Sequence, residues 1–244
     1  MGEYVGERDA VGARAGRGSY KWPRGAFAYT GEWSNGLMHG HGVLHAGDST
    51  IEGEFHEGEI DGLGVKTWYA VDGGAPTKVY RGELRGGELH GSGELCTSTE
   101  RYVGAFVGNR REGAHGALTV AAVALELGAW CEATPGDLSE GAWVADVMHG
   151  PGALRRGDGF SFRGDFVRGR RTGHGSAEWS GGATYVGVWA NDERSRGSYA
   201  CKQSGVAYDG AWCGRRPFDA FRTTAAPQAR RFARQPERIA GRAL

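Results

Sequence analysis

The stretch "YTGEWSNGLMHGHGVLHAGDST", residues Tyr29–Thr50, indicates how this chain folds. An aromatic, a glycine and a second aromatic alternate at its start, glycines and histidines follow, and an apolar segment comes next. Side chains alternate between the two faces of a β-strand, so Tyr29, Gly31 and Trp33 should share one face. We expect the glycine-rich group to make a turn, because glycine adopts positive φ without steric cost. The second strand should then be residues 43–46. The stretch predicts one β-hairpin.

The same pattern recurs along the chain with a period of about 22 or 23 residues, which is the signature of a repeat architecture. The copies are Tyr29-Gly31-Trp33, Ile51-Gly53-Phe55, Tyr80-Gly82-Leu84, Tyr102-Gly104-Phe106, Ser139-Gly141-Trp143, Phe162-Gly164-Phe166, Tyr185-Gly187-Trp189, Tyr208-Gly210-Trp212 and a degraded first copy, Tyr4-Gly6-Arg8. A lone hairpin is barely stable in water, whereas stacked hairpins support one another. Nine copies predict an all-β fold: an elongated, single-layer antiparallel sheet of stacked hairpins, roughly 85 Å long at about 4.8 Å per strand.

Two sets of glycines have structural roles in this prediction, one in the gap between the aromatics and one in the glycine-rich groups. They are Gly31, Gly40, Gly42, Gly53, Gly82, Gly91, Gly93, Gly104, Gly150, Gly152, Gly164, Gly173, Gly175, Gly187 and Gly210. The chain has 45 glycines, which excludes a long-helix protein because each glycine costs about 1 kcal/mol in a helix interior. Its 8 Trp, 9 Tyr and 9 Phe argue against disorder.

The repeat array should cover residues 1–216, with insertions near residues 70–78 and 125–138. The remaining residues, 217–244, break the pattern, are rich in arginine, and should form an arm or a short helix. The four cysteines form no Cys-x-x-Cys pair, which predicts free thiols. The N-terminus lacks the basic and apolar segments of a signal peptide, so we expect a cytoplasmic protein.

The repeated unit, with groups such as "HGHG" (His39–Gly42), "HGSG" (His90–Gly93) and "TGHG" (Thr172–Gly175), resembles the MORN (membrane occupation and recognition nexus) repeat. The resemblance covers residues 4–216 and implies a non-catalytic scaffold that binds other proteins. MORN-only proteins of this size resemble radial-spoke and other axonemal components, which implies a cytoskeletal location in a cilium or flagellum. The resemblance also allows a regulatory subunit of an enzyme complex.

No motif for chemistry stands out. The chain lacks the P-loop, the dinucleotide fingerprint, the G-x-S-x-G elbow and the H-E-x-x-H zinc motif. His39, His90 and His149 hold the same place in their units, but equivalent positions on successive hairpins lie about 10 Å apart, too far to share a metal. We therefore predict no catalytic residues, no metal and no cofactor.

The predicted binding surface is the row of aromatic positions on one face. Either these rings only pack against each other, or some of them line a groove that takes a partner, such as a helix. The candidates are Tyr29, Trp33, Phe55, Tyr80, Tyr102, Phe106, Trp143, Phe162, Phe166, Tyr185, Trp189, Tyr208 and Trp212.

Charge suggests where partners bind. Residues 1–122 hold 12 basic and 16 acidic residues and residues 123–244 hold 17 and 13, which gives −4 and +4. We expect protein partners in a large assembly and a homodimer contact at the C-terminal edge, where the last unit loses its return strand after Cys213. No nucleic acid is expected. The alternative is an anionic-membrane tether through the arginine pairs 110/111, 170/171 and 215/216, although such tethers favour clusters of about 4–8 basic residues.

Overall fold

The computed structural model describes residues 2–70, 74–120, 136–214, 216 and 217. Within these ranges the chain forms eighteen β-strands and no helix, so the predicted all-β fold is confirmed. The strands are β1 (Glu3–Arg8), β2 (Arg14–Lys21), β3 (Phe27–Ser34), β4 (Leu37–Ala46), β5 (Ser49–His56), β6 (Glu59–Tyr69), β7 (Pro76–Arg85), β8 (Glu88–Thr97), β9 (Glu100–Val107), β10 (Arg110–Val120), β11 (Asp137–Val144), β12 (Val147–Arg155), β13 (Ser161–Val167), β14 (Arg170–Glu178), β15 (Ala183–Ala190), β16 (Glu193–Cys201), β17 (Val206–Gly214) and β18 (Arg216–Pro217).

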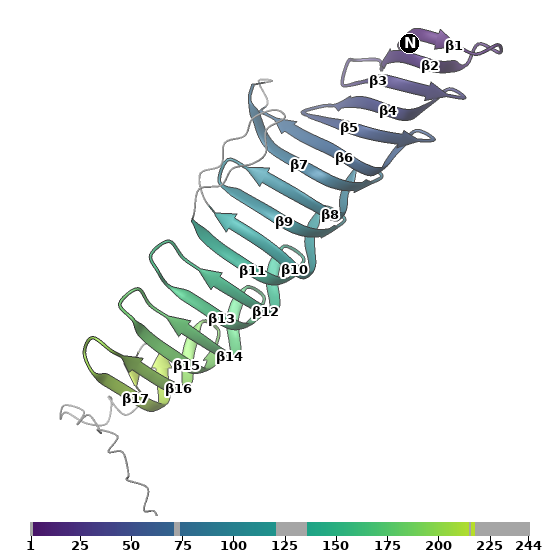
Figure 1. The fold of residues 1–244 in the computed structure, drawn as a ribbon. Helices are drawn as coiled ribbons and strands as arrows, with labels where there is room; N and C mark the ends of the chain where they lie inside the picture. The colour runs from purple at the N-terminus through teal and green to yellow at the C-terminus, as the bar shows by residue number, and fades with distance from the viewer. Residues whose placement is uncertain (1, 71–73, 121–135, 215, 218–244) are drawn as a thin grey trace, which may run out of the picture.

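Each strand pairs antiparallel with the next strand in the sequence, from β1 with β2 to β17 with β18. The strands lie across the long axis of the molecule in chain order, with β1 at one end and β17 at the other (Figure 1). The predicted elongated array of stacked hairpins is therefore confirmed.

The tight turns do not lie where the sequence pattern suggested. Residues His39–Gly42 lie inside β4, which begins at Leu37, and the turn is Asn35-Gly36, with φ of 51° and 79°. Two successive residues with positive φ form a type I′ turn, whose twist matches that of the paired strands. The equivalent turns are Glu57-Gly58, Gly86-Gly87, Gly108-Asn109, Ala145-Asp146, Arg168-Gly169 and Asn191-Asp192. Two-residue turns explain why the second strands are much longer than the predicted residues 43–46.

One glycine from each of the strands β1 to β17 lies in a continuous row across the sheet. In each adjacent pair the two glycines are direct cross-strand partners, as Gly31 is with Gly42. We call this row the glycine spine: Gly6, Gly18, Gly31, Gly42, Gly53, Gly64, Gly82, Gly93, Gly104, Gly116, Gly141, Gly152, Gly164, Gly175, Gly187, Gly197 and Gly210. A Cβ added at Gly31 would lie 2.5 Å from the Cα of Gly42, so the facing backbones leave no room for a side chain.

A β-bulge beside the spine accounts for the glycine-rich groups. Gly31 pairs with Gly42, but the next residue, Glu32, pairs with His39, so Gly40 and His41 are extra residues in β4. Gly40 has a φ of 56°, which suits glycine at a bulge. Gly91, Gly150 and Gly173 have positive φ at the equivalent places. A bulge bends its strand, and bulges in successive hairpins bend the whole sheet along one line.

The bend folds the two halves of each strand toward one another. Lys66 pairs with Tyr80 across the sheet, yet its Nζ donates a hydrogen bond of 2.8 Å to the carbonyl oxygen of Gly87. Tyr80 lies five residues before the end of β7 at Arg85, which is about 17 Å along a flat strand, and Gly87 lies in the turn beyond it. A lysine side chain crosses that span only if the strand curls. The sheet is therefore a single layer folded around its own inner face, and Figure 1 shows the curvature of the strands.

Several details of the ends and insertions differ from the predictions. β18 supplies the first two residues of a return strand, with Trp212 opposite Pro217, so the edge near Trp212 is partly covered. The first insertion narrows to residues 70–75, because β7 begins at Pro76. Most of the second insertion and residues 218–244 lie outside the described residues. Cys201 and Cys213 are free thiols as predicted, but Cys96 is disulfide-bonded, which its spacing did not reveal.

Candidate functional site

The aromatic row on the inner face forms a ladder of edge-to-face contacts. The ring of Tyr29 lies 5.1 Å from Trp33 in its own hairpin and 5.0 Å from Phe55 in the next. The same two contacts recur for Tyr102, with Phe106 at 5.2 Å and Trp143 at 5.4 Å. Edge-to-face geometry is the preferred arrangement of aromatic pairs. The ladder is the core of the folded sheet.

Each tyrosine of the ladder covers the glycine spine and satisfies its own hydroxyl. The Tyr80 Oη donates to the carbonyl oxygens of Glu83, at 2.8 Å, and His90, at 3.0 Å, and Tyr29 bonds Glu32 and His39 in the same way. Burial raises the pKa of Tyr29 and of Tyr80 to about 12, because a phenolate would lose its hydration there. These tyrosines stay neutral and act as structural donors.

A second row of side chains packs on the ladder, and we call its members lid residues. The second residue of β10, Arg111, is a lid residue, and its guanidinium lies 5.1 Å from the Trp143 ring of the next hairpin. Arg14, Arg171 and Arg194 lie on Trp33, Trp189 and Trp212 at 4.4, 4.5 and 4.0 Å. Each of these tryptophans donates its indole N–H to a spine glycine carbonyl of the preceding strand. Cation–π contact and an anchored indole thus occur together.

In the other hairpins the lid residue is Met, Ile or Leu, and the residue that it covers is a phenylalanine or a leucine. A Cβ built at Gly64 would meet both Ile60 and Leu84, and one at Gly152 would meet both Met148 and Phe166. Met38 and Leu89 are the lid residues before Phe55 and Phe106. Across eight successive hairpins, every arginine lid precedes a tryptophan and every aliphatic lid precedes a phenylalanine or leucine. Neighbouring hairpins are therefore matched by size and charge.

The structure buries most of the residues predicted to line a partner groove. Tyr29, Tyr80 and Tyr185 are 0% exposed, and of the thirteen candidates only Tyr208 is outside the buried class. These rings lie on one inner face, as predicted, but the folded sheet closes over them. Binding at this face stays a prediction, and a partner would contact the residues around the ladder instead. These rim residues are Tyr20, Trp22, Leu44, Trp68, Leu95, Leu118, Leu154, Trp179 and Tyr199.

Two lysines give the rim its most unusual feature. The Nζ atoms of Lys66 and Lys78 lie 5.2 and 4.6 Å from the Trp68 ring, so one indole contacts two ammonium groups. Burial lowers the pKa of both lysines, and the positive charges of Lys78 and Arg111 further lower the pKa of Lys66 and of Lys78, respectively. Within the part of the chain that the structure describes, neither lysine forms an ion pair. The rim is therefore largely apolar, with cationic groups at Trp68 and, through Arg14 and Arg194, at Tyr20, Trp179 and Tyr199.

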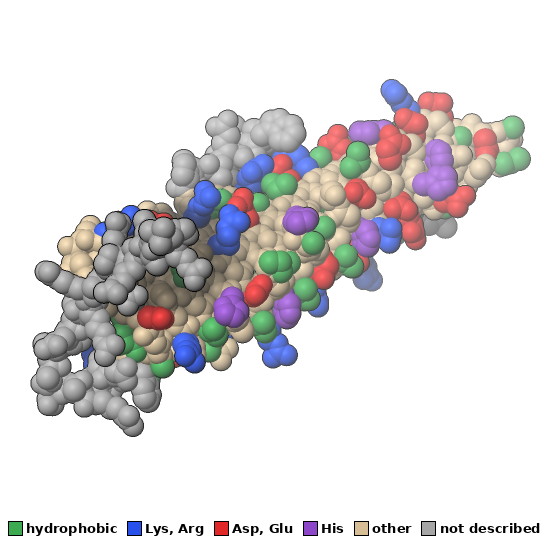
Figure 2. Space-filling view, turned by 60° about the horizontal axis from the view of Figure 1, so that its bottom comes forward, with side chains coloured by type: hydrophobic (Ala, Val, Ile, Leu, Met, Phe, Trp, Pro, Cys, Tyr) green, Lys and Arg blue, Asp and Glu red, His purple; other side chains and the backbone are tan. Residues whose placement is uncertain are grey.

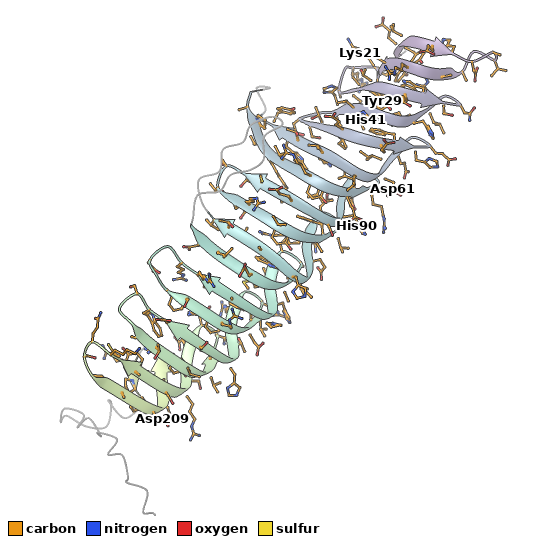
Figure 3. All side chains as sticks on the ribbon, in the orientation of Figure 1. Lys21, Tyr29, His41, Asp61, His90 and Asp209 are labelled. Atoms are coloured by element: carbon orange, nitrogen blue, oxygen red, sulfur yellow. The ribbon has the colours of Figure 1, made fainter. Side chains whose placement is uncertain are left out.

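The described residues form no cluster of metal-binding side chains. No group of three or more His, Cys, Asp or Glu side chains lies close enough to hold a metal ion within those ranges. His41, Asp61, His90 and Asp209 are spread along the array rather than gathered (Figure 3). The same residues contain no helix of sufficient length and apolar character to cross a bilayer.

Sequence reasoning missed two groups of residues that build this face. Gly18, Gly116 and Gly197 complete the spine. Their positions could have been predicted, because each follows the glycine of an aromatic-glycine-aromatic copy (Gly6, Gly104 and Gly187) at the distance expected for the facing strand. The arginine lids were missed because Arg111 and Arg171 stand in Arg-Arg pairs that resemble exposed charge. In the structure the side chains of Arg111 and Arg171 are only 17% and 16% exposed.

Comparison with known proteins agrees with this geometry. The chain is similar to Alsin of Homo sapiens and of Pan troglodytes, at 31% identity over 167 residues, which cover 60% of this chain and 10% of Alsin. It is 28% identical to Alsin of Mus musculus over 163 residues, 62% of this chain and 9% of Alsin. The chain thus spans about one tenth of the length of the curated relatives that it matches.

The model of the MORN repeat matches residues 12–27, 29–51, 52–69, 80–98, 140–160 and 162–184. The hairpins that begin at Tyr102 and Tyr185 have the same spine, ladder and lid although the family model does not match them. With six matched repeats and a continuous array of equivalent hairpins, this chain is a MORN-repeat protein.

Proposed function

We propose that this chain is a non-catalytic scaffold that binds other proteins along a stiff array. The observation that supports this proposal is the contrast between the side chains that join the hairpins and those that remain exposed to solvent. Aromatic and lid residues interlock every hairpin with the next, while valines and leucines such as Leu63, Val144 and Val186 stand 71%, 45% and 62% exposed. Exposed apolar side chains on a rigid frame favour a binding surface. MORN-repeat proteins are typically non-catalytic, which agrees with this reading.

The membrane-tether alternative depends on the arginine pairs, and the structure weakens it. Arg111 and Arg171 are lid residues, with side chains only 17% and 16% exposed, so each of those pairs presents one free arginine instead of two. Membrane attraction needs about 4–8 basic residues close together at one surface. Protein binding is therefore the better-supported proposal.

The finer proposal places the scaffold in the cytoskeleton of a cilium or flagellum, as a radial-spoke-like component. It is supported by the resemblance in repeat content to MORN-only proteins of such assemblies. A regulatory subunit of an enzyme complex is the second placement, and the same experiment separates them.

The test uses the intact chain with a small tag in a ciliated cell. Chemical cross-linking followed by mass spectrometry should identify the same protein neighbours in repeated preparations, and fluorescence should place the chain along the axoneme. A catalytic neighbour and a diffuse signal would favour the regulatory subunit instead. Flotation with phosphoinositide vesicles that is lost as salt rises, without reproducible protein neighbours, would overturn the scaffold proposal.

A further inference from the structure

Three successive hairpin tips carry the same kind of surface on the outer face, opposite the rings. Val107 pairs with Arg110, Val144 with Val147 and Val167 with Arg170, and each pair directly flanks a type I′ turn. Direct cross-strand partners project from the same face, and Val107, Val144 and Val167 each follow an inward ring by one residue. We call these six residues the valine–arginine patch.

The valines of the patch are solvent-exposed without a structural reason. Val107, Val144, Val147 and Val167 are 52%, 45%, 42% and 44% exposed. At the other tight tips the same positions hold no valine, and three of the four pairs contain a glutamate: Ser34/Leu37, His56/Glu59, Arg85/Glu88 and Ala190/Glu193. The patch is therefore a local departure from the repeat, with an apolar centre and an arginine on each side.

The charges around the patch are available for a partner. Arg110 and Arg170 are exposed, as is Arg168 in the turn between Val167 and Arg170, and none of the three forms an ion pair within the described residues. Two carboxylates near the patch accept backbone N–H groups. Glu112 accepts the backbone N–H of Ala145 at 3.0 Å, and Asp146 accepts that of Arg111 at 2.9 Å.

The charge pattern of the whole array agrees with this local picture. Acidic side chains are numerous on the N-terminal part of the face shown in Figure 2. A partner with carboxylates would be repelled by the acidic N-terminal region and attracted by Arg110, Arg168 and Arg170 at the patch. Charge complementarity therefore favours an acidic partner at the patch.

The distance between successive hairpin tips indicates the secondary structure of that partner. Two strands per hairpin put successive tips about 9.6 Å apart. Residues seven apart on an α-helix are separated by about 10.5 Å along its axis, so a helix lying along the array would match three tips to within about 2 Å. Side chains on one face of an extended strand repeat every ~6.6 Å and do not match. A helix with a heptad apolar stripe suits the tips best.

We propose that the valine–arginine patch docks an amphipathic helix of a partner protein, with an aliphatic stripe over the valines and carboxylates over Arg110 and Arg170. This inference rests on the proposed scaffold function and names one of its surfaces. It differs from a helix in the aromatic groove, because the patch lies on the opposite face of the sheet and its side chains are accessible in the folded array.

The test measures fluorescence anisotropy of a labelled 21-residue helical peptide titrated with the intact chain. The peptide carries leucine every seventh residue with flanking glutamates, and its control has lysine in place of every glutamate. The protein variants are Val144→Thr with Val147→Thr, and Arg110→Gln with Arg170→Gln. Threonine keeps the branched shape that strands favour, so folding should persist, and circular dichroism with thermal melting verifies it. Arg85→Gln, at a tip outside the patch, is the matched control.

We expect the glutamate peptide to bind the parent chain and each double variant to bind it roughly tenfold more weakly, with Arg85→Gln unchanged. Equal binding of the lysine peptide, or unchanged binding by both double variants, would overturn the proposal. So would loss of self-association in the valine variant, which would assign the patch to a second copy, or binding only to anionic vesicles. If the peptide fails while cross-linking still finds protein neighbours, this inference fails alone; if both fail, the scaffold proposal fails too.

Discussion

The middle hairpins and the C-terminal hairpins build the same folded sheet from different chemistry. Between β5 and β9 the lids are Ile60 and Leu89 and the ladder includes Leu84, so the lids there are aliphatic. Between β14 and β17 the lids are Arg171 and Arg194, each on a tryptophan. The shared elements are the glycine spine and the type I′ turns. The comparison teaches that backbone geometry defines the unit, whereas the lid defines which neighbour fits.

Removing an aliphatic lid should have the largest effect. Leu89 is 1% exposed, and Leu89→Ala should lower the free energy of unfolding by about 2–5 kcal/mol, because it removes buried methyl groups and leaves a cavity. Urea unfolding followed by circular dichroism measures it. Val186→Ala, at a residue 62% exposed, is the control and should change stability by less than about 0.5 kcal/mol. A similar loss in both variants would mean that the lids do not carry the middle region.

High pH should destabilise the hairpins that contain a ladder tyrosine, but not the hairpin that has Phe162 at the same position. The pKa of Tyr29 and Tyr80 is raised from 10.0 to about 12 on folding. A group whose pKa is raised by folding contributes its full stability below its unfolded pKa and loses it as pH rises through the folded value. Stability should therefore fall between pH 10 and pH 12, by up to about 3 kcal/mol for each tyrosine.

Thermal melting across that pH range measures the loss, and Tyr80→Phe should reduce it because its ring cannot ionise. The ultraviolet absorbance of phenolate gives an independent readout. If all tyrosines of the folded chain ionise near pH 10, the ladder is more hydrated than its burial indicates.

The glycine spine should be equally intolerant in both regions. A Cβ at Gly82 would lie 2.5 Å from the Cα of Gly93, and one at Gly187 would lie 2.6 Å from the Cα of Gly197. Gly82→Val and Gly187→Val should each cost about 1–3 kcal/mol by overpacking. Gly157→Val is the control, because nothing lies within 4 Å of its added Cβ. Variants of the spine that melt with the parent protein would show that the facing strands can separate.

Replacing an arginine lid and its tryptophan by a methionine and a phenylalanine should have the smallest effect on stability. It also compares the two kinds of lid most directly. A double-mutant cycle with Arg171→Met and Trp189→Phe replaces this C-terminal pair by the combination that Met148 and Phe166 form. The pair should show a coupling of about 0.5–2 kcal/mol, since the guanidinium lies 4.5 Å from the indole. Additive effects, measured by urea unfolding, would mean that lid and ring are not matched and only fill space.

Much of the fold could be predicted because the same residue pattern recurs in every repeat. Alternation in Tyr29-Gly31-Trp33 fixed the inner face, and recurrence fixed the number and order of hairpins. The turn was misplaced because the glycines of His39–Gly42 were read as a turn, although Asn35-Gly36 carried the stronger hairpin signal. Folding of the sheet depends on contacts such as that of Lys66 with Gly87, which join residues 21 positions apart and have no local pattern.

The candidate site was predicted less well, for a related reason. Rings that are exposed on a flat sheet become interior once the sheet curls, so the predicted groove residues are core residues. The rim and the outer tips depend on which face remains open, and single positions such as Val144 and Val147 look ordinary in the sequence.

The type I′ turns have a consequence for how the chain is made. In most hairpins the backbone N–H of the second turn residue bonds the carbonyl oxygen of the preceding lid residue: Gly36 to Arg14, Gly58 to Met38, Asn109 to Leu89, Asp146 to Arg111, Gly169 to Met148 and Asp192 to Arg171. Every one of these bonds points toward the N-terminus, so a hairpin docks on a surface that was synthesised before it. A ribosome adds about 5–20 residues per second, so a new unit emerges every few seconds onto a finished template. The array is thus suited to fold from its N-terminus toward its C-terminus during translation. The lid residue of each completed hairpin provides the surface on which the ring of the next hairpin packs.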